Sequence, residues 1–202
     1  MLDRLAIAAL KPALDAAAAR LVRAGVGADG VTLAGFALGM AAAAAIALQR
    51  PLAGLVLLLA SRLCDGLDGA VARLTRPTDA GAFLDISLDF LFYAGMPLAF
   101  ALADPAANAL PAALLLAAFI GTGSSFLAFA ILAERRGLDS SAYPDKGFYY
   151  LGGLTEATET LVCFALMCLW PDRFAVLAYG FAALCGVTVI TRIVGGWQLL
   201  RA

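Results

Sequence analysis

Four aspartates in two short segments are the residues of this sequence best suited to chemistry. Asp65 and Asp68 are three residues apart, and Asp85 and Asp89 are four apart. On helices, both spacings place the two carboxylates of a pair on one face. Pro77, which would break a helix, lies at nearly equal distances from the two pairs. We therefore expect two antiparallel helices, packed about 8–10 Å apart, that bring all four carboxylates together.

A cluster of four carboxylates near a low-dielectric region needs positive charge, because like charges repel one another. Arg62 and Arg73 are too few to neutralise it, and the chain has no histidine. Metal ligands and any general base must therefore be carboxylates, whose oxygens suit hard cations. Mg²⁺ or Mn²⁺ is the expected cofactor, and two ions roughly 3.5–4 Å apart would suit a displacement at phosphorus. The predicted metal ligands are Asp65, Asp68, Asp85 and Asp89.

Small residues accompany the aspartates. Gly66, Gly69, Ala72 and Gly81 would leave the inner face of the hairpin nearly bare, so that a bulky polar ligand could approach the backbone. Arg73 stands two turns from Asp65 and could hold a phosphate oxygen. Taken alone, such small residues serve more often for packing in membrane helices.

The composition places most of this chain in lipid. Of its 202 residues 63% are hydrophobic and 14% are charged, and the mean hydropathy is +0.91. The run 109–133 is long enough to cross a bilayer, which disfavours a soluble helical core. No basic cluster points to nucleic acid. The four cysteines have no CxxC spacing and lie in apolar segments, so they are expected to be free thiols.

We predict an all-α integral membrane protein with a single domain over residues 1–202. An N-terminal amphipathic helix over residues 1–26 would lie at the membrane surface, although a soluble helix explains this segment equally well. Six transmembrane helices follow, over about 30–49, 51–73, 79–103, 109–133, 147–170 and 174–200.

The distribution of basic residues predicts the orientation. Most lysines and arginines fall on the side of the two termini, which the positive-inside rule assigns to the cytoplasm. The aspartates would then lie at the cytoplasmic face, and we expect a bacterial inner membrane. Gly35 and Gly39 form a GxxxG motif, for which packing within one subunit and formation of a homodimer are equally good explanations.

Around the aspartates the sequence resembles the CDP-alcohol phosphotransferase family. The family signature is D-x-x-D-G-x-x-A-R, a short spacer and G-x-x-x-D-x-x-x-D. The chain departs from the family only in the spacer, which has seven residues, from Leu74 to Ala80, where the family usually has eight. This shorter spacer affects the expected shape of the connecting loop. The matching residues are Asp65, Asp68, Gly69, Ala72, Arg73, Gly81, Asp85 and Asp89.

The resemblance implies an enzyme of phospholipid biosynthesis. Such a transferase passes the phosphatidyl group of a CDP-alcohol, usually CDP-diacylglycerol, to a small alcohol acceptor and releases CMP. The resemblance makes Asp89 both a metal ligand and the catalytic base that takes the proton of the acceptor hydroxyl. It implies a CDP-binding set of Asp68, Gly69, Ala72, Arg73 and Gly81.

The acceptor alcohol is less well indicated. Arg135, Arg136, Lys146 and Arg192 could form a basic pocket for a phosphorylated polyol such as glycerol 3-phosphate. Basic residues at cytoplasmic helix ends also serve topology alone, which explains Arg135 and Arg136 equally well. Glu156, with its neighbour Glu159, could bind a cationic or polyol headgroup, pair with Arg192, or remain protonated and hydrogen-bonded.

Two other classes of function fit part of this pattern. A cation transporter or channel also carries intramembrane carboxylates, but it would spread them over several helices near the middle of the membrane. These four lie at one end of one hairpin. An inactive scaffold is disfavoured because four unused aspartates would only make membrane insertion costlier.

Overall fold

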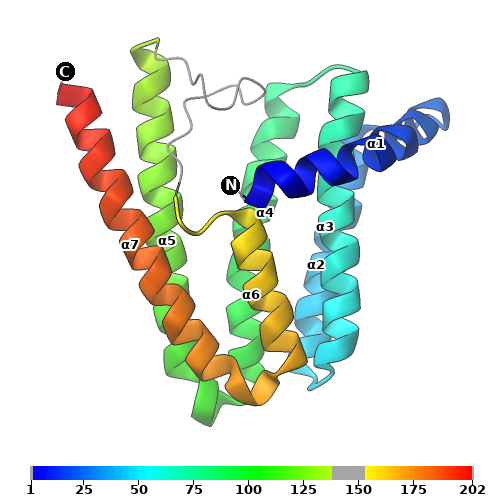
Figure 1. Cartoon of the computed structure of the whole chain (residues 1–202). Helices are drawn as coiled ribbons and strands as arrows, with labels where there is room; N and C mark the ends of the chain where they lie inside the picture. The colour runs from blue at the N-terminus through cyan, green and yellow to red at the C-terminus, as the bar shows by residue number, and fades with distance from the viewer. Residues whose placement is uncertain (1, 138–152, 202) are drawn as a thin grey trace.

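Long helices that run side by side make up most of the molecule (Figure 1). The computed structural model describes residues 2–137 and 153–201, and these contain helices and no strand. The elements are α1 (Leu2–Arg23), α2 (Ala28–Ala47), α3 (Pro51–Leu74), α4 (Asp79–Ala103), α5 (Pro105–Arg135), α6 (Ala157–Leu169), the short 3-10 helix η1 (Pro171–Arg173) and α7 (Phe174–Arg201).

Short turns between α2, α3, α4 and α5 make neighbouring helices antiparallel, and the local sequence explains where the helices begin. Pro51 and Pro105 occupy the first positions of α3 and α5, where a missing N–H costs no hydrogen bond. Thr78 caps α4 by accepting a 3.0 Å hydrogen bond from Gly81 N, and Asp104 caps α5 in the same way. Figure 1 shows that the α3–α4 connection lies at the same end of the bundle as the C-terminus.

The packing of α2 decides how the two aspartate helices are arranged. α2 packs extensively against both α3 and α4, whereas α3 and α4 make few direct contacts with each other. The closely packed hairpin expected from the sequence is therefore wrong, because α2 supplies the surface on which both helices rest. The gap left between α3 and α4 gives their carboxylates room to face a common space.

The two glycines of the GxxxG motif are used within the chain. A Cβ at Gly35 would lie 2.9 Å from Cys64 Cβ, and one at Gly39 would lie 2.6 Å from Cδ2 of Phe92. Glycine at these positions lets α2 approach α3 and α4 closely. A homodimer would therefore have to form through a different surface.

Four helical segments are long and apolar enough to cross a membrane, namely α2, α4, α5 and the segment Pro171–Arg201. α3 has 24 residues, about 36 Å of helix, but it carries Arg62, Asp65, Asp68 and Arg73. The 13 residues of α6 span only about 20 Å. The count of six transmembrane helices thus stays a prediction.

The helix predicted over residues 147–170 is shorter than expected. α6 begins at Ala157, and residues 153–156 are not helical, while residues 147–152 lie outside the described part of the chain. A capping box explains the start, because Glu159 Oε2 accepts a 3.1 Å hydrogen bond from the backbone N of Glu156. Glu156 and Glu159 therefore serve, at least in part, to begin this helix.

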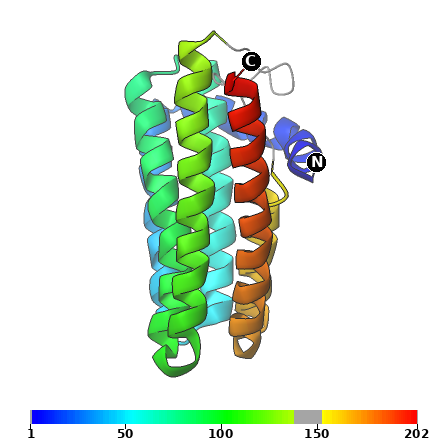
Figure 2. The ribbon, with the colours of Figure 1, turned by 90° about the vertical axis from the view of Figure 1, so that its left-hand side faces the viewer.

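Helix α1 lies across the others, over α3 and near the start of α6 (Figure 1). Ala18 is fully buried against Ala70 and Val71 of α3. Figure 2, turned by 90°, shows the remaining helices as an elongated bundle with α1 to one side. The amphipathic character of α1 and its place at a membrane surface stay predictions.

Candidate active site

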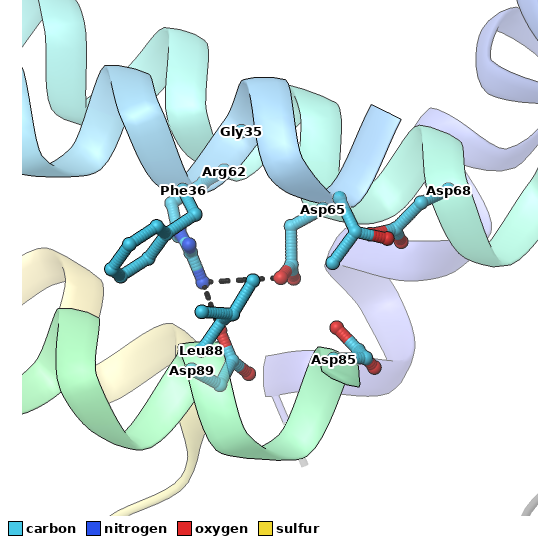
Figure 3. Close-up of a pocket in the computed structure, with 9 residues that line it drawn as sticks. Gly35, Phe36, Arg62, Asp65, Asp68, Asp85, Leu88 and Asp89 are labelled. Carbon is cyan, nitrogen blue, oxygen red and sulfur yellow. Dashed lines mark hydrogen bonds and ion pairs between the residues drawn. The ribbon is translucent and has the colours of Figure 1, made fainter. Parts of the chain in front are cut away.

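The four aspartates line a single pocket between α2, α3 and α4 (Figure 3). Asp65, Asp85 and Asp89 each offer one carboxylate oxygen, and these three oxygens lie within 4.8 Å of one another. The structure thus brings the predicted ligands from the two helices together. The complete lining is Thr32, Gly35, Phe36, Arg62, Asp65, Asp68, Asp85, Leu88 and Asp89.

Asp68 stands slightly apart from the other three carboxylates (Figure 3). Its Oδ1 accepts a 2.6 Å hydrogen bond from Gly69 N. Its Oδ2 is buried and has no hydrogen-bond partner among the described residues. An unsatisfied buried carboxylate oxygen is costly, so this atom is suited to receive a cation or a ligand donor.

The donor set as a whole fits a divalent cation. Three clustered carboxylates and one unsatisfied carboxylate oxygen provide only hard oxygen ligands, as Mg²⁺ and Mn²⁺ prefer. The carboxylates are also accessible, since the side chains of Asp65 and Asp89 are 37% and 34% exposed.

Arg62 is a site residue whose role the sequence did not indicate, since from sequence it was expected only to be too little positive charge for the aspartates. Its Nη1 donates to Asp89 Oδ1 at 2.7 Å and to Asp65 Oδ1 at 3.3 Å. Its Cζ lies 3.8 Å from the centre of the Phe92 ring. The available signal was a charged residue in an apolar run, three positions before Asp65 and hence on the same helix face.

A second and larger cavity, of about 390 Å³, adjoins the first and shares Thr32, Asp68 and Asp85 with it. It contains Gly69, Ala72 and Gly81, three of the residues that the resemblance assigned to CDP binding. The lining of the larger cavity is Gly27, Ala28, Asp29, Thr32, Asp68, Gly69, Ala72, Thr75, Arg76, Pro77, Thr78, Gly81, Ala82 and Asp85.

The glycines at this cavity differ in what they face. A Cβ at Gly81 would lie 3.0 Å from Asp29 Oδ1 and 3.1 Å from Thr78 Oγ1, so this glycine keeps a polar corner of the cavity open. A Cβ at Gly69 would meet only Arg73 Nη1, at 3.4 Å. Arg73 is thus beside the cavity although it is not part of the lining.

Gly66 does not belong to the inner face, contrary to the expectation from sequence. A Cβ at this position would lie 3.1 Å from Leu14 Cδ1, so Gly66 lies under α1. Helix α1 covers one side of α3, and the geometry of a hairpin alone does not reveal this contact. Asp29 and Thr32 were missed for a similar reason, since the start of α2 reaches the cavity only through the packing of α2 on α3 and α4.

The candidate acceptor residues lie elsewhere. Arg192 is 8% exposed, donates from Nη1 to the carbonyl of Thr122 at 3.2 Å, and lies over the ring of Phe126. Glu156 is also 8% exposed, at the start of α6. Arg135 and Arg136 are exposed at the end of α5, and Lys146 lies outside the described residues. Neither cavity is lined by any of the four described residues.

Comparisons with known proteins identify relatives of this chain. The sequence model of the CDP-alcohol phosphatidyltransferase family matches residues 26–194. The inner membrane protein YnjF of Escherichia coli strain K12 is 54% identical over 202 residues, which is 100% of this chain and 98% of that protein. Archaetidylinositol phosphate synthase of Methanothermobacter thermautotrophicus is 51% identical over 65 residues, 32% of this chain and 33% of that protein.

Solved structures share the fold. Phosphatidylinositol phosphate synthase (PgsA1) of Mycobacterium tuberculosis with CDP-DAG bound has a TM-score of 0.73 and 22% identity, covering 91% of this chain and 93% of that one. The same enzyme in complex with manganese and citrate has a TM-score of 0.71 and 22% identity, covering 91% and 88%. Their likeness extends over nearly the whole arrangement of helices.

Proposed function

This chain belongs to the CDP-alcohol phosphatidyltransferase family and is a transferase of substituted phosphate groups, and we propose that it transfers the phosphatidyl group of CDP-diacylglycerol to an alcohol and releases CMP. The observation that carries this proposal is the convergence of all four signature aspartates on one pocket. It is supported by the archaetidylinositol phosphate synthase relative and by the neighbour that has CDP-DAG bound.

Asp65, Asp68, Asp85 and Asp89 are the proposed metal ligands. The cofactor would be Mg²⁺ or Mn²⁺, in two ions, and the manganese complex of the structural neighbour supports this class of metal. When bound, divalent ions would offset the negative charge of the diphosphate and of the CMP leaving group. Through the positive charge of these ions, the aspartates would hold the donor's phosphates where the pocket meets the larger cavity.

The larger cavity is the proposed place for the CDP group. Asp68, Gly69, Ala72 and Gly81 line it, and Arg73 lies beside Gly69, where its guanidinium could contact a phosphate oxygen. The bare backbone at Gly69 and Gly81 lets a flat or bulky polar group come close. Asp29, Thr32 and Arg76 add polar groups to the same cavity.

Asp89 is the proposed general base. Its Oδ1 accepts a hydrogen bond from Arg62, which leaves Oδ2 for a ligand or a proton. The side chain is 34% exposed, so an acceptor hydroxyl could approach it. Asp89 would take the proton from that hydroxyl as its oxygen attacks the phosphorus.

The proposed acceptor is glycerol 3-phosphate or another phosphorylated polyol. The buried position of Arg192 supports this choice, because a buried guanidinium binds an anionic group more strongly than an exposed one. Arg135, Arg136, Lys146 and Glu156 remain further candidates for this acceptor site. The exposure of Arg135 and Arg136 at the end of α5 favours topology as their role.

The proposed setting is an inner membrane, as for the Escherichia coli relative. α3 and α6 would complete six membrane helices, with both termini and the aspartates at the cytoplasmic face. The common end of the C-terminus and the α3–α4 connection supports this orientation (Figure 1). A cation transporter or channel is not favoured, because the carboxylates gather in one pocket beside a ligand-sized cavity.

An acceptor panel tests the proposal. Purified protein with CDP-diacylglycerol and Mg²⁺ or Mn²⁺ should release CMP when glycerol 3-phosphate is added, and more slowly with unphosphorylated glycerol or with serine. CMP release only with an unphosphorylated alcohol would keep the reaction class and reject the acceptor. No CMP release with any alcohol would reject the substrate assignment.

A further inference from the structure

Arg62 joins the two aspartate helices at a place where they make few other contacts. Its Nη1 reaches Asp65 on its own helix, α3, and Asp89 on α4. α3 and α4 pack mainly on α2 rather than on each other. Packing on α2 sets where the backbones of α3 and α4 lie, and Arg62 is the side chain that joins these two carboxylates across the helices.

The guanidinium is held in place by groups other than the aspartates. It lies 3.8 Å over the ring of Phe92, and its Nη2 donates to Ser61 Oγ at 3.2 Å. Ser61 is fully buried and itself donates to the carbonyl of Gly35 at 2.7 Å. The side chain of Arg62 is only 10% exposed. A planar cation fixed by stacking and by a buried hydrogen-bond partner is a rigid anchor.

Arg62 contacts one oxygen of each carboxylate. The two hydrogen bonds go to Oδ1 of Asp65 and Oδ1 of Asp89, from the same nitrogen. In Figure 3 the guanidinium and the two carboxylates converge, while Asp85 lies on the other side of the pocket. Each carboxylate thus keeps a second oxygen that makes no hydrogen bond to Arg62 and can be offered to a cation.

We propose that Arg62 is the positioning residue of the metal site: it fixes the orientation of Asp65 and Asp89 across α3 and α4 and stays in place when the cation binds. This inference rests on the proposed function. Groups that hydrogen-bond to metal-ligating carboxylates hold them in the binding geometry, and their removal typically weakens metal binding by about 10–100-fold.

If Arg62 instead competed with the metal ion, its removal would have the opposite effect on metal binding. If Arg62 were a stand-in cation that metal must displace, its removal would free two oxygens and would strengthen metal binding. The sign of the change in Kd therefore separates a positioning residue from a competitor, and a general loss of folding would change metal-free stability as well.

Mn²⁺ binding to the purified protein, measured by electron paramagnetic resonance without any CDP donor, gives the required sign. Arg62→Met should raise the Kd for Mn²⁺ about 10–100-fold. Arg62→Lys keeps the charge but lacks the planar group that stacks on Phe92 and bridges two carboxylates, so its Kd should fall between those of Arg62→Met and wild type. Arg50→Met, at the N-cap position of α3 and about three helical turns before Arg62, is the matched control and should bind Mn²⁺ as wild type does.

Ser61→Ala keeps the guanidinium and removes one of its hydrogen bonds, so it serves even if Arg62→Met does not fold. One hydrogen bond corresponds to a rise in Kd of about 2–10-fold. If Arg62→Met folds, unchanged or tighter Mn²⁺ binding would overturn the inference. If Arg62→Met does not fold, unchanged Mn²⁺ binding in Ser61→Ala would overturn it. Failure of the wild-type protein to bind Mn²⁺ would instead reject the proposed metal dependence.

Discussion

Gly39 of α2 faces the ring of Phe92 of α4 so closely that a Cβ on the glycine would lie 2.6 Å from Cδ2 of the ring. Ser61 Oγ would lie 3.0 Å from the same Cβ. Phe92 and Ser61 are two of the groups that hold Arg62, so this contact supports the carboxylate pocket as well as the helix packing.

Gly39→Ala should therefore destabilise the protein. Both neighbours are fully buried and cannot move aside easily, and overpacking of this kind costs about 1–3 kcal/mol. Gly180→Ala is a suitable control, because this glycine lies within α7 and a Cβ there meets nothing within 4 Å. Thermal unfolding in detergent should show a lower Tm for Gly39→Ala and an equal or higher Tm for Gly180→Ala. Equal Tm values for Gly39→Ala and wild type would contradict the packing described for α2.

Substitution at Asp89 and Asp65 should separate base catalysis from coordination. Asp89→Asn keeps the shape and one oxygen ligand but cannot accept a proton, so kcat should fall by about 10²–10⁴-fold. CDP affinity should fall much less. Asp65→Asn should weaken metal and donor binding together, because its proposed task is coordination.

Titration of CDP and single-turnover transfer, measured on both variants, check this comparison. The shared hydrogen bonds to Arg62 make the two variants a close pair, since each loses a negative charge beside the same guanidinium. If Asp89→Asn transfers at a near-normal rate, or both variants lose CDP binding and transfer in equal proportion, Asp89 is not the base. Glu156 would then be the next carboxylate to test.

The residues of the candidate site could be predicted from the sequence more completely than the packing of the helices. The helical spacing of the four aspartates, with a helix break at Pro77, predicted that their side chains would share a site, and they line one pocket. Gly69, Ala72 and Gly81 were expected beside them from residue type and from the family resemblance, and they line the adjoining cavity. The membership of the CDP-alcohol phosphatidyltransferase family, indicated by the same residues, is confirmed.

What the sequence did not reveal depends on contacts between distant segments. The positions of Asp29 and Thr32 at the cavity follow from how α2 packs, and Gly66 is hidden under α1 by Leu14. The positive charge of Arg62 is too small to neutralise four aspartates, and its importance lies instead in its geometry. One nitrogen of its guanidinium donates to two carboxylates, one on α3 and one on α4. The late start of α6 is a local effect, because Glu156 and Glu159 form a capping box inside a segment predicted to be one transmembrane helix.

Neutralising Arg192 should affect the acceptor and not the donor. A charge-assisted hydrogen bond to a phosphate contributes about 1.5–3 kcal/mol, so Arg192→Gln should raise the KM of glycerol 3-phosphate by roughly 10–100-fold. The KM of CDP-diacylglycerol should change little, because Arg192 lines neither cavity. Arg135→Gln, at the exposed end of α5, is the control for a purely topological role.

Steady-state kinetics with each substrate varied in turn decide this point. An equal rise in the KM of CDP-diacylglycerol would indicate that Arg192 contacts the nucleotide donor instead of the acceptor. Unchanged KM values for both substrates would leave Arg192 a structural role, to which its contacts with the carbonyl of Thr122 and the ring of Phe126 contribute. Tm should be measured in parallel, since Arg192 is buried and its loss also removes that contact.

The requirement for a divalent cation is the most direct test of the account, because it rests on the three clustered carboxylates and on the unsatisfied Oδ2 of Asp68. The measurement is CMP release from CDP-diacylglycerol by the purified protein, with glycerol 3-phosphate as acceptor, before and after treatment with EDTA. The account predicts that chelation abolishes CMP release and that either Mg²⁺ or Mn²⁺ restores it. Full CMP release in metal-free buffer would contradict it.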